Sequence, residues 1–293
     1  MIYMVDITWK DTKNRIESGF FNNEIECLKT IVLNISENCQ LKCPMCPRAH
    51  GYPNRDIFMP MNVVRIIRDR LCEINYKNII SISGNGEPTM NNNLIEILKL
   101  LSKDKYGNKT NYKLQVLSNF IKEDDELYLD ILKYSDLYIS LHKYHTEVYK
   151  KYFDERIKSL KGKYKGTNKI FVRNHDPESD ECTGKFTNRG GWMNPDKELL
   201  KVPCYYPFYK IFIDYDGTYY QCADDWLRKS NKDKLNVFHT SIEDYFVKYL
   251  HSLKIELLTR GRKYIEACNT CSTNGIMMGD KEIEFFKHRY LEK

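Results

Sequence analysis

Three cysteines stand close together early in the chain, at Cys39, Cys43 and Cys46, in the stretch SENCQLKCPMCPRAHG. Three thiolates at this spacing can hold one face of a cuboidal iron-sulfur cluster and leave its fourth iron without a protein ligand. The alternative is a structural zinc site, but such sites normally take four protein ligands. The spacing therefore favours an iron-sulfur cluster with one open iron.

A second group of cysteines lies in the C-terminal part of the chain, and its members are Cys204, Cys222, Cys268 and Cys271. The first two flank a predicted β-hairpin, and the last two form a CxxC pair. Four thiolates can enclose a metal completely. By ligand count alone, zinc and an iron-sulfur cluster fit this group almost equally well.

A glycine-containing turn, 83–88 with the sequence SGNGEP, follows a predicted strand one strand-helix unit after the first cysteines. Glycine lets the backbone approach another group closely, although such a turn is a weak signal by itself. Polar residues also stand at or near the ends of the next two predicted strands. The residues in these places are Gly84, Asn85, Gly86, Glu87, Asn119 and Ser140, and a strand-end Ser or Asn is often just a cap or a turn residue.

The elements that must position these residues alternate between strand and helix. Short β-rich apolar runs predict strands over 28–36, 78–83, 112–118, 137–141 and 169–173. Helical spacing of apolar residues predicts helices over 61–74, 93–102, 123–132 and about 146–160. This order predicts an α/β fold, a parallel sheet or a partial (β/α) barrel of five to six parallel strands with helices outside, and functional residues at the carboxyl ends of the strands.

The alternation stops after Asn174. Residues 174–198 are rich in turn formers and predict a connecting or active-site loop. An Asp216-Gly217 turn then predicts a β-hairpin over 210–222, and a helix is expected over 243–258. We therefore expect a small C-terminal β-hairpin and helix domain that carries the second group of cysteines.

Composition excludes several classes of protein. The net charge of +6 comes from 46 basic and 40 acidic residues that are scattered along the chain, so charge alone does not indicate nucleic acid. No window supplies about 18 consecutive apolar residues, and no signal peptide is evident. We expect a cytoplasmic protein whose ten cysteines serve mostly as ligands or catalysts, because disulfides are rare in that compartment.

The first cysteine spacing, placed after the first strand of a partial (β/α) barrel, resembles the radical SAM superfamily. The resemblance implies that the open iron chelates S-adenosylmethionine (AdoMet) and that one electron cleaves it to methionine and a 5′-deoxyadenosyl radical. It also implies that the turn 83–88 acts as the family's Gly-Gly-Glu motif and that Asn119 and Ser140 contact AdoMet. Met45 departs from the pattern, since the family commonly has an aromatic residue there, but a thioether can still pack against adenine.

The second group, with Gly217 before Cys222 and a distant CxxC, resembles the twitch appendage, a shortened SPASM domain. This resemblance implies a second, auxiliary 4Fe-4S cluster and the division 1–28, 29–190 and 191–293 into extension, barrel and twitch domain. The segment 188–192 (NRGGW) resembles one that recurs before such appendages, and it suggests an active-site role for Arg189. Cys182 in the preceding loop is either a hydrogen-atom donor or a surface thiol.

Compact family members of this kind include dehydrogenases of aminocyclitols. The resemblance therefore implies oxidation, or otherwise epimerisation, of a small polar substrate such as a sugar or aminocyclitol, with an external electron donor such as flavodoxin or ferredoxin. Modification of a ribosomally made peptide is the alternative, although 28 residues before the first strand are too few for a leader-binding domain. A non-enzymatic electron carrier or zinc protein would need neither an open-iron cysteine loop nor the glycine turn.

Overall fold

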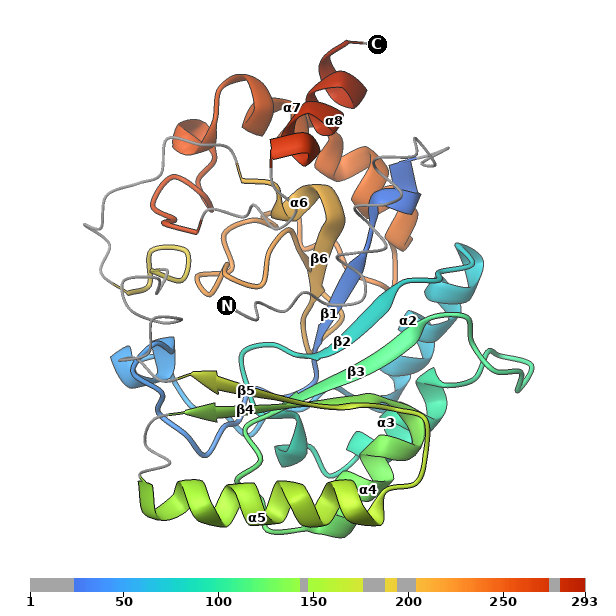
Figure 1. The fold of residues 1–293 in the computed structure, drawn as a ribbon. Helices are drawn as coiled ribbons and strands as arrows, with labels where there is room; N and C mark the ends of the chain where they lie inside the picture. Colours follow the sequence, from blue (N-terminus) through green and yellow to red (C-terminus); the bar gives the residue numbers. More distant parts are fainter. Residues whose placement is uncertain (1–23, 143–146, 176–187, 194–203, 274–279, 293) are drawn as a thin grey trace.

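Seven strands form one open, twisted sheet in the order β5-β4-β3-β2-β1-β6-β7 (Figure 1). This computed structural model describes residues 24–142, 147–175, 188–193, 204–273 and 280–292. Six of the strands are parallel, namely β1 (Thr30–Asn34), β2 (Ile79–Ser83), β3 (Lys113–Ser118), β4 (Asp136–His142), β5 (Ile170–His175) and β6 (Lys210–Ile213). The predicted α/β fold with five to six parallel strands is confirmed.

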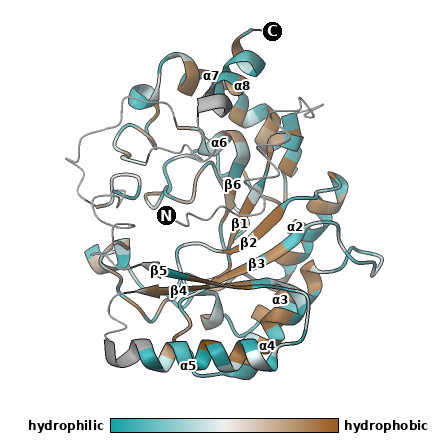
Figure 2. Cartoon of the chain, viewed as in Figure 1, coloured by the Kyte–Doolittle hydropathy of each residue, from teal (hydrophilic) through white to brown (hydrophobic). Residues whose placement is uncertain are grey.

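Four helices connect β1 through β5, and consecutive helices contact one another along one side of the sheet (Figure 1). They are α2 (Met61–Glu73), α3 (Leu94–Leu101), α4 (Asp125–Tyr134) and α5 (Glu147–Lys163). Helix α4 begins within the expected acidic run. The Asp124 side chain caps it by accepting from the Leu127 N–H at 3.0 Å. Figure 2 shows hydrophobic residues concentrated on the strands and hydrophilic ones on the outer faces of α4 and α5.

The predicted hairpin continues the main sheet instead of standing apart from it. β6 pairs in parallel with β1, and β7 (Tyr219–Tyr220) pairs antiparallel with β6 across the Asp216-Gly217 turn. The first and last thirds of the chain thus share one layer of backbone hydrogen bonds. The division at residue 190 remains a prediction.

The C-terminal part packs helices around the β6 end of the sheet. A π-helical turn, η4 (Asp244–Tyr249), runs into α7 (Leu250–Thr259), close to the predicted helix over 243–258. The other elements there and in the loops are α6 (Tyr206–Tyr209), α8 (Asp280–Leu291), η1 (Glu24–Cys27), η2 (Pro47–His50), η3 (Pro88–Met90) and η5 (Arg262–Tyr264). No helix of the described ranges is long and apolar enough to span a membrane.

Candidate active site

The first three cysteines lie on the loop that follows β1, at the carboxyl edge of the parallel sheet. We call residues 35–59 the cysteine loop. Its two ends are joined by backbone hydrogen bonds from the Glu37 N–H to Ile57 O (2.9 Å) and from the Met59 N–H to Ile35 O (3.0 Å). All three thiols are partly exposed. The hydrogen-bonded ends of the loop therefore hold three partly exposed cysteines at the edge of the sheet where the parallel strands end.

A buried arginine fixes the shape of this loop. The Arg48 guanidinium, on η2, donates to the Glu37 carbonyl at 2.6 Å and to the Asn85 carbonyl at 2.8 Å. It also donates to Pro53 O at 2.9 Å and to Asn54 Oδ1 at 2.8 Å, and Asn54 Oδ1 in turn accepts from the Cys39 N–H. Arg48 therefore connects the cysteine loop to the glycine turn after β2. Sequence reasoning missed it, since a single arginine carries no spacing signal.

The glycine turn packs directly against the cysteine loop and the end of β1, and each of its glycines is required by one of these contacts. A Cβ on Gly86 would lie 2.7 Å from Asn38 O and closer still to Ser36 O, and one on Gly84 would lie 2.5 Å from Asn34 Oδ1. Gly84 also has φ +123°, a conformation that side chains rarely adopt. The turn backbone is thereby held against the residues just before Cys39, with the Glu87 N–H donating to Asn38 O at 2.8 Å.

The Glu87 carboxylate organises the next strand end. It is buried and accepts from the Thr89 and Ser118 hydroxyls at 2.8 Å and from the Asn119 N–H at 2.8 Å. Burial raises the pKa of Glu87, although these hydrogen bonds oppose the shift by stabilising the charged form. Glu87 therefore serves the architecture of the turn, tying the end of β2 to the end of β3.

Asn119 reaches the cysteine loop from the end of β3. Its Nδ2 lies 3.8 Å from Cys39 Sγ, and its Oδ1 accepts from Gln40 Nε2 at 3.3 Å. Ser140 is partly buried on β4, opposite Arg173 of β5 and two residues before the strand ends. The predicted residues of β1, β2 and β3 thus meet around one loop, whereas Ser140 lies farther along the sheet on β4.

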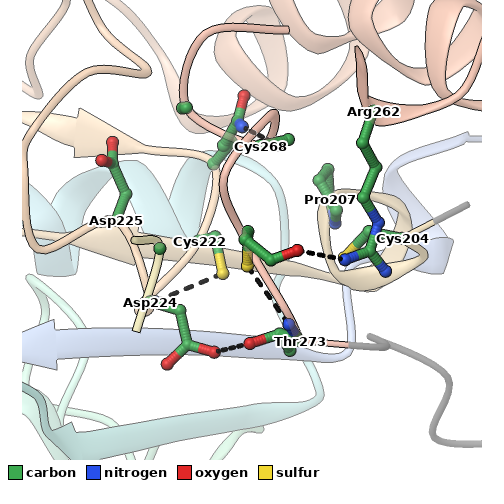
Figure 3. Close-up of a pocket in the computed structure, with 12 residues that line it drawn as sticks. Cys204, Pro207, Cys222, Asp224, Asp225, Arg262, Cys268 and Thr273 are labelled. Carbon is green, nitrogen blue, oxygen red and sulfur yellow. Dashed lines mark hydrogen bonds between the residues drawn. The ribbon is translucent and has the colours of Figure 1, made fainter. Parts of the chain in front are cut away.

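The four later cysteines line a single pocket (Figure 3). Cys204, Cys268 and Cys271 are buried and Cys222 is partly exposed. We call this the four-cysteine pocket. Three of its sulfurs accept hydrogen bonds, from Gln221 Nε2 to Cys268 at 3.2 Å, from the Asp224 N–H to Cys222 at 3.3 Å and from the Thr273 N–H to Cys271 at 3.4 Å.

Charged residues surround this pocket. Figure 3 shows the buried Arg262 beside Cys204, and its NH1 donates to Cys271 O at 3.1 Å. Burial works against ionisation of Asp224, but its ion pair with Arg189 (2.9 Å) and the Thr273 hydroxyl outweigh it, so the pKa of Asp224 is lowered. The pocket therefore combines sulfur, backbone donors and fixed charges.

Burial is the main cause of raised thiol pKa values at both cysteine groups. It raises the pKa of Cys39 to about 12 and that of Cys204 to about 11, and it raises those of Cys222 and Cys268 as well. These thiols hold their protons at neutral pH unless a cation replaces them. In the described ranges, no three Cys, His, Asp or Glu side chains already converge into a site for one metal ion.

The turn 188–193 joins the two cysteine groups. Asn188 Oδ1 accepts from the Ser272 N–H at 2.9 Å, directly after Cys271. On the other side, Arg189 Nε donates to Met45 O at 3.4 Å and Trp192 Nε1 donates to His50 O at 3.1 Å. Gly190 and Gly191 have φ of +65° and +89°, and a side chain on either would collide with Asp224 O or Thr270.

Arg189 therefore lies between the cysteine loop and the four-cysteine pocket, with its side chain 36% exposed. Cys182, the other candidate catalytic residue, lies in 176–187, outside the described residues, so its role stays a prediction.

Compared with known protein families, residues 33–174 match the radical SAM superfamily. This stretch is a radical SAM superfamily domain. It contains the cysteine loop, the glycine turn, Asn119 and Ser140, and it ends before the four-cysteine pocket. No curated protein matches the chain.

Solved structures of radical SAM proteins share the fold beyond that domain. BtrN in complex with AdoMet and 2-DOIA superposes with a TM-score of 0.70 at 15% identity, over 86% of this chain and 96% of that one. The anSMEcpe protein with bound AdoMet gives a TM-score of 0.54 at 13% identity, over 89% of this chain and 96% of that one. At these identities the likeness establishes the fold and leaves the substrate open.

Proposed function

We propose that the chain is a radical SAM oxidoreductase that binds AdoMet and one 4Fe-4S cluster at the cysteine loop. The ligands would be Cys39, Cys43 and Cys46. The observation that carries the proposal is the meeting of the cysteine loop, the glycine turn and Asn119 at the carboxyl ends of β1, β2 and β3, inside a radical SAM domain. When bound, the cluster supplies one electron to the AdoMet sulfonium, which yields the 5′-deoxyadenosyl radical.

The glycine turn and Asn119 fit the proposed AdoMet site. The glycine turn, held by Arg48 and Asn34, presents backbone at the cluster side, and Asn119 presents an amide beside Cys39. The donor set fits the cluster, because three partly exposed cysteines with free thiols lie on one loop, and iron binding would displace their protons. Ser140 is proposed to contact AdoMet from β4.

We further propose that the four-cysteine pocket holds an auxiliary 4Fe-4S cluster, as the twitch resemblance implies. The donor set fits, since four cysteines share one pocket and three of their sulfurs accept N–H hydrogen bonds, which stabilise thiolate ligands.

The proposed reaction is hydrogen-atom abstraction from a small polar substrate, a sugar or aminocyclitol, that is then oxidised or epimerised. The likeness to BtrN, solved with AdoMet and 2-DOIA, supports a small molecule. Arg189 is proposed to face the substrate, because it lies between the two cysteine groups and is partly exposed. If the outcome is epimerisation, Cys182 is the proposed hydrogen-atom donor. A reduced flavodoxin or ferredoxin in the cytoplasm would supply the electrons.

Peptide modification is the second candidate function. It is favoured by the likeness to anSMEcpe with bound AdoMet and the Cp18Cys peptide, which has a TM-score of 0.50 at 15% identity. The deciding experiment incubates reduced, reconstituted protein with AdoMet and deuterated candidate sugars, aminocyclitols or peptides. Deuterium in 5′-deoxyadenosine identifies the substrate class, and AdoMet that remains uncleaved under all conditions would overturn the proposed function.

A further inference from the structure

Arg228 reaches from the C-terminal part of the chain to the base of the first site. Its Nε donates to Asp214 Oδ2 at 2.7 Å, and its NH2 donates to Glu37 Oε1 at 3.1 Å. Both carboxylates are almost fully buried, with side chains 5% and 1% exposed, while the arginine is 21% exposed. The positive charge of Arg228 thus offsets the negative charge of Glu37 in the cysteine loop.

The same guanidinium also faces the glycine turn. The Asn85 amide, oriented by its hydrogen-bond network, accepts from NH1 and NH2 of Arg228 at 2.6 and 2.8 Å. NH1 also donates to Asp225 O at 3.3 Å, so all three guanidinium nitrogens are engaged. These acceptors suit the five fixed N–H donors of an arginine guanidinium, whereas a lysine ammonium offers three donors on a single nitrogen.

A buried asparagine closes the network. Asn34, the last residue of β1, donates through Nδ2 to Glu37 Oε1 and to Asp214 Oδ1, each at 2.7 Å. Its Oδ1 accepts from the Asn85 N–H at 2.9 Å. The ends of β1, β2 and β6 are therefore tied together around two acids and one arginine.

Arg228 also adopts a costly backbone conformation. Its φ is +55°, which is uncommon for residues other than glycine and is maintained only where the surroundings fix it. The cation lies over the Phe212 and Tyr220 rings, 5.5 and 5.3 Å from their centroids. These ring contacts lie beside the hydrogen bonds that hold the guanidinium at the glycine turn.

We propose that Arg228 is a positioning residue for the AdoMet site: it sets the glycine turn through Asn85 and the cysteine loop through Glu37, without touching AdoMet itself. The inference rests on the proposed function, in which the glycine turn binds AdoMet. It makes the segment 214–228 a structural part of the first site as well as of the four-cysteine pocket.

The test compares AdoMet binding by calorimetry in anaerobically reconstituted parent, Arg228→Lys and Arg228→Met. Loss of a residue that orients a metal ligand typically costs about ten- to a hundredfold in affinity, and we expect a loss of AdoMet affinity in this range for both variants, because Arg228 orients the glycine turn in the same indirect way. Arg260→Met is the matched control, because Arg260 is 58% exposed and its side chain contacts Glu256 and the Tyr264 ring, neither of which belongs to the AdoMet site. It should bind AdoMet as the parent does.

A double variant separates positioning from charge balance. Arg228→Met with Asp214→Asn removes one acid along with the cation, so the fold should recover, as measured by circular dichroism. It does not restore the donors to Asn85, so AdoMet binding should stay at least about tenfold weaker. This outcome, or weak binding by folded Arg228→Lys, supports the proposal.

Parent affinity in folded Arg228→Lys or in the folded double variant would overturn it, since Arg228 would then act through charge alone. A parent protein that binds no AdoMet would overturn the proposed function and this inference with it. Binding by the parent and equally by the variants would overturn the inference only.

Discussion

Gly86→Ala is the sharpest single perturbation of the first site. The added methyl would stand 2.7 Å from Asn38 O and closer to Ser36 O, whereas Cβ atoms essentially never come within 3.0 Å of such a neighbour. Both oxygens belong to backbone one to three residues before Cys39, so no flexible side chain can move away. The cysteine loop itself must retreat, by roughly 1 Å, from the turn.

Two consequences of different size follow. Overpacking of this kind costs about 1–3 kcal/mol of stability, which lowers the melting temperature without unfolding the protein. A displacement of about 1 Å at a reacting site can cost on the order of a hundredfold in rate. We therefore expect 5′-deoxyadenosine formation to fall about a hundredfold in a protein that still folds and reconstitutes iron.

The assay measures 5′-deoxyadenosine by chromatography, alongside AdoMet binding and thermal unfolding. Gly162→Ala is the control, because nothing lies within 4 Å of its added methyl and the residue is in α5, where alanine is favoured over glycine. That variant should be neutral or slightly more stable. A Gly86→Ala protein that cleaves AdoMet at the parent rate would refute the close approach on which the site is built.

The remaining predictions concern metal content, electron transfer and pH. Reconstitution should yield about eight irons per chain, alanine at the three cysteines of the cysteine loop should remove half of them, and zinc recovered in place of the other half would contradict the auxiliary cluster. Exchanging Cys268 and Cys271 for alanine should leave 5′-deoxyadenosine formation measurable while oxidised product falls much further, provided circular dichroism shows a folded protein. Burial lowers the pKa of Lys254 to about 8, so the unfolded chain binds more protons between about pH 8 and pH 10.5, and stability should rise with pH there by about 3 kcal/mol. Lys254→Met should flatten this rise in chemical denaturation, and an unchanged slope would count against the burial of the charge.

The sequence predicted the elements of the parallel sheet well because each has its own local signal. The five predicted strands and four predicted helices of the barrel correspond to β1–β5 and α2–α5 with small differences at their ends. The lone Asp216-Gly217 turn also located the β6-β7 hairpin. Alternation and helical spacing of apolar residues can be recognised within about ten residues, so they predict strands and helices without any knowledge of the fold.

Long-range pairing had no such signal. β6 lies beside β1 although the two are separated by about 180 residues, and α8 was not predicted at all. A strand's own sequence states which of its faces is buried, and not which strand it joins. The hairpin was therefore expected in a separate appendage, and only the register between β1 and β6 shows that it extends the main sheet.

The same limit explains which site residues were missed. Cysteines and a glycine turn can be recognised in a sequence by residue type and spacing. Arg48, Glu37 and Arg228 are ordinary charged residues, which usually lie on the surface. Their importance comes from burial, because a buried charge needs partners from other segments, and those partners are set by the fold. Arg48 binds within and beside its own loop, but Arg228 finds Glu37 across 191 positions of sequence.

These missed charges explain how the two cysteine groups are held relative to each other. The turn 188–193 contacts the cysteine loop through Arg189 and the region after Cys271 through Asn188, while Arg228 fastens the segment after Cys222 to the end of β1. Together with the β1-β6 pairing, these links restrict how the two groups can move relative to each other. These contacts set the separation between the two cysteine groups, and a fixed separation is what electron transfer between them would require if the four-cysteine pocket holds the proposed auxiliary cluster.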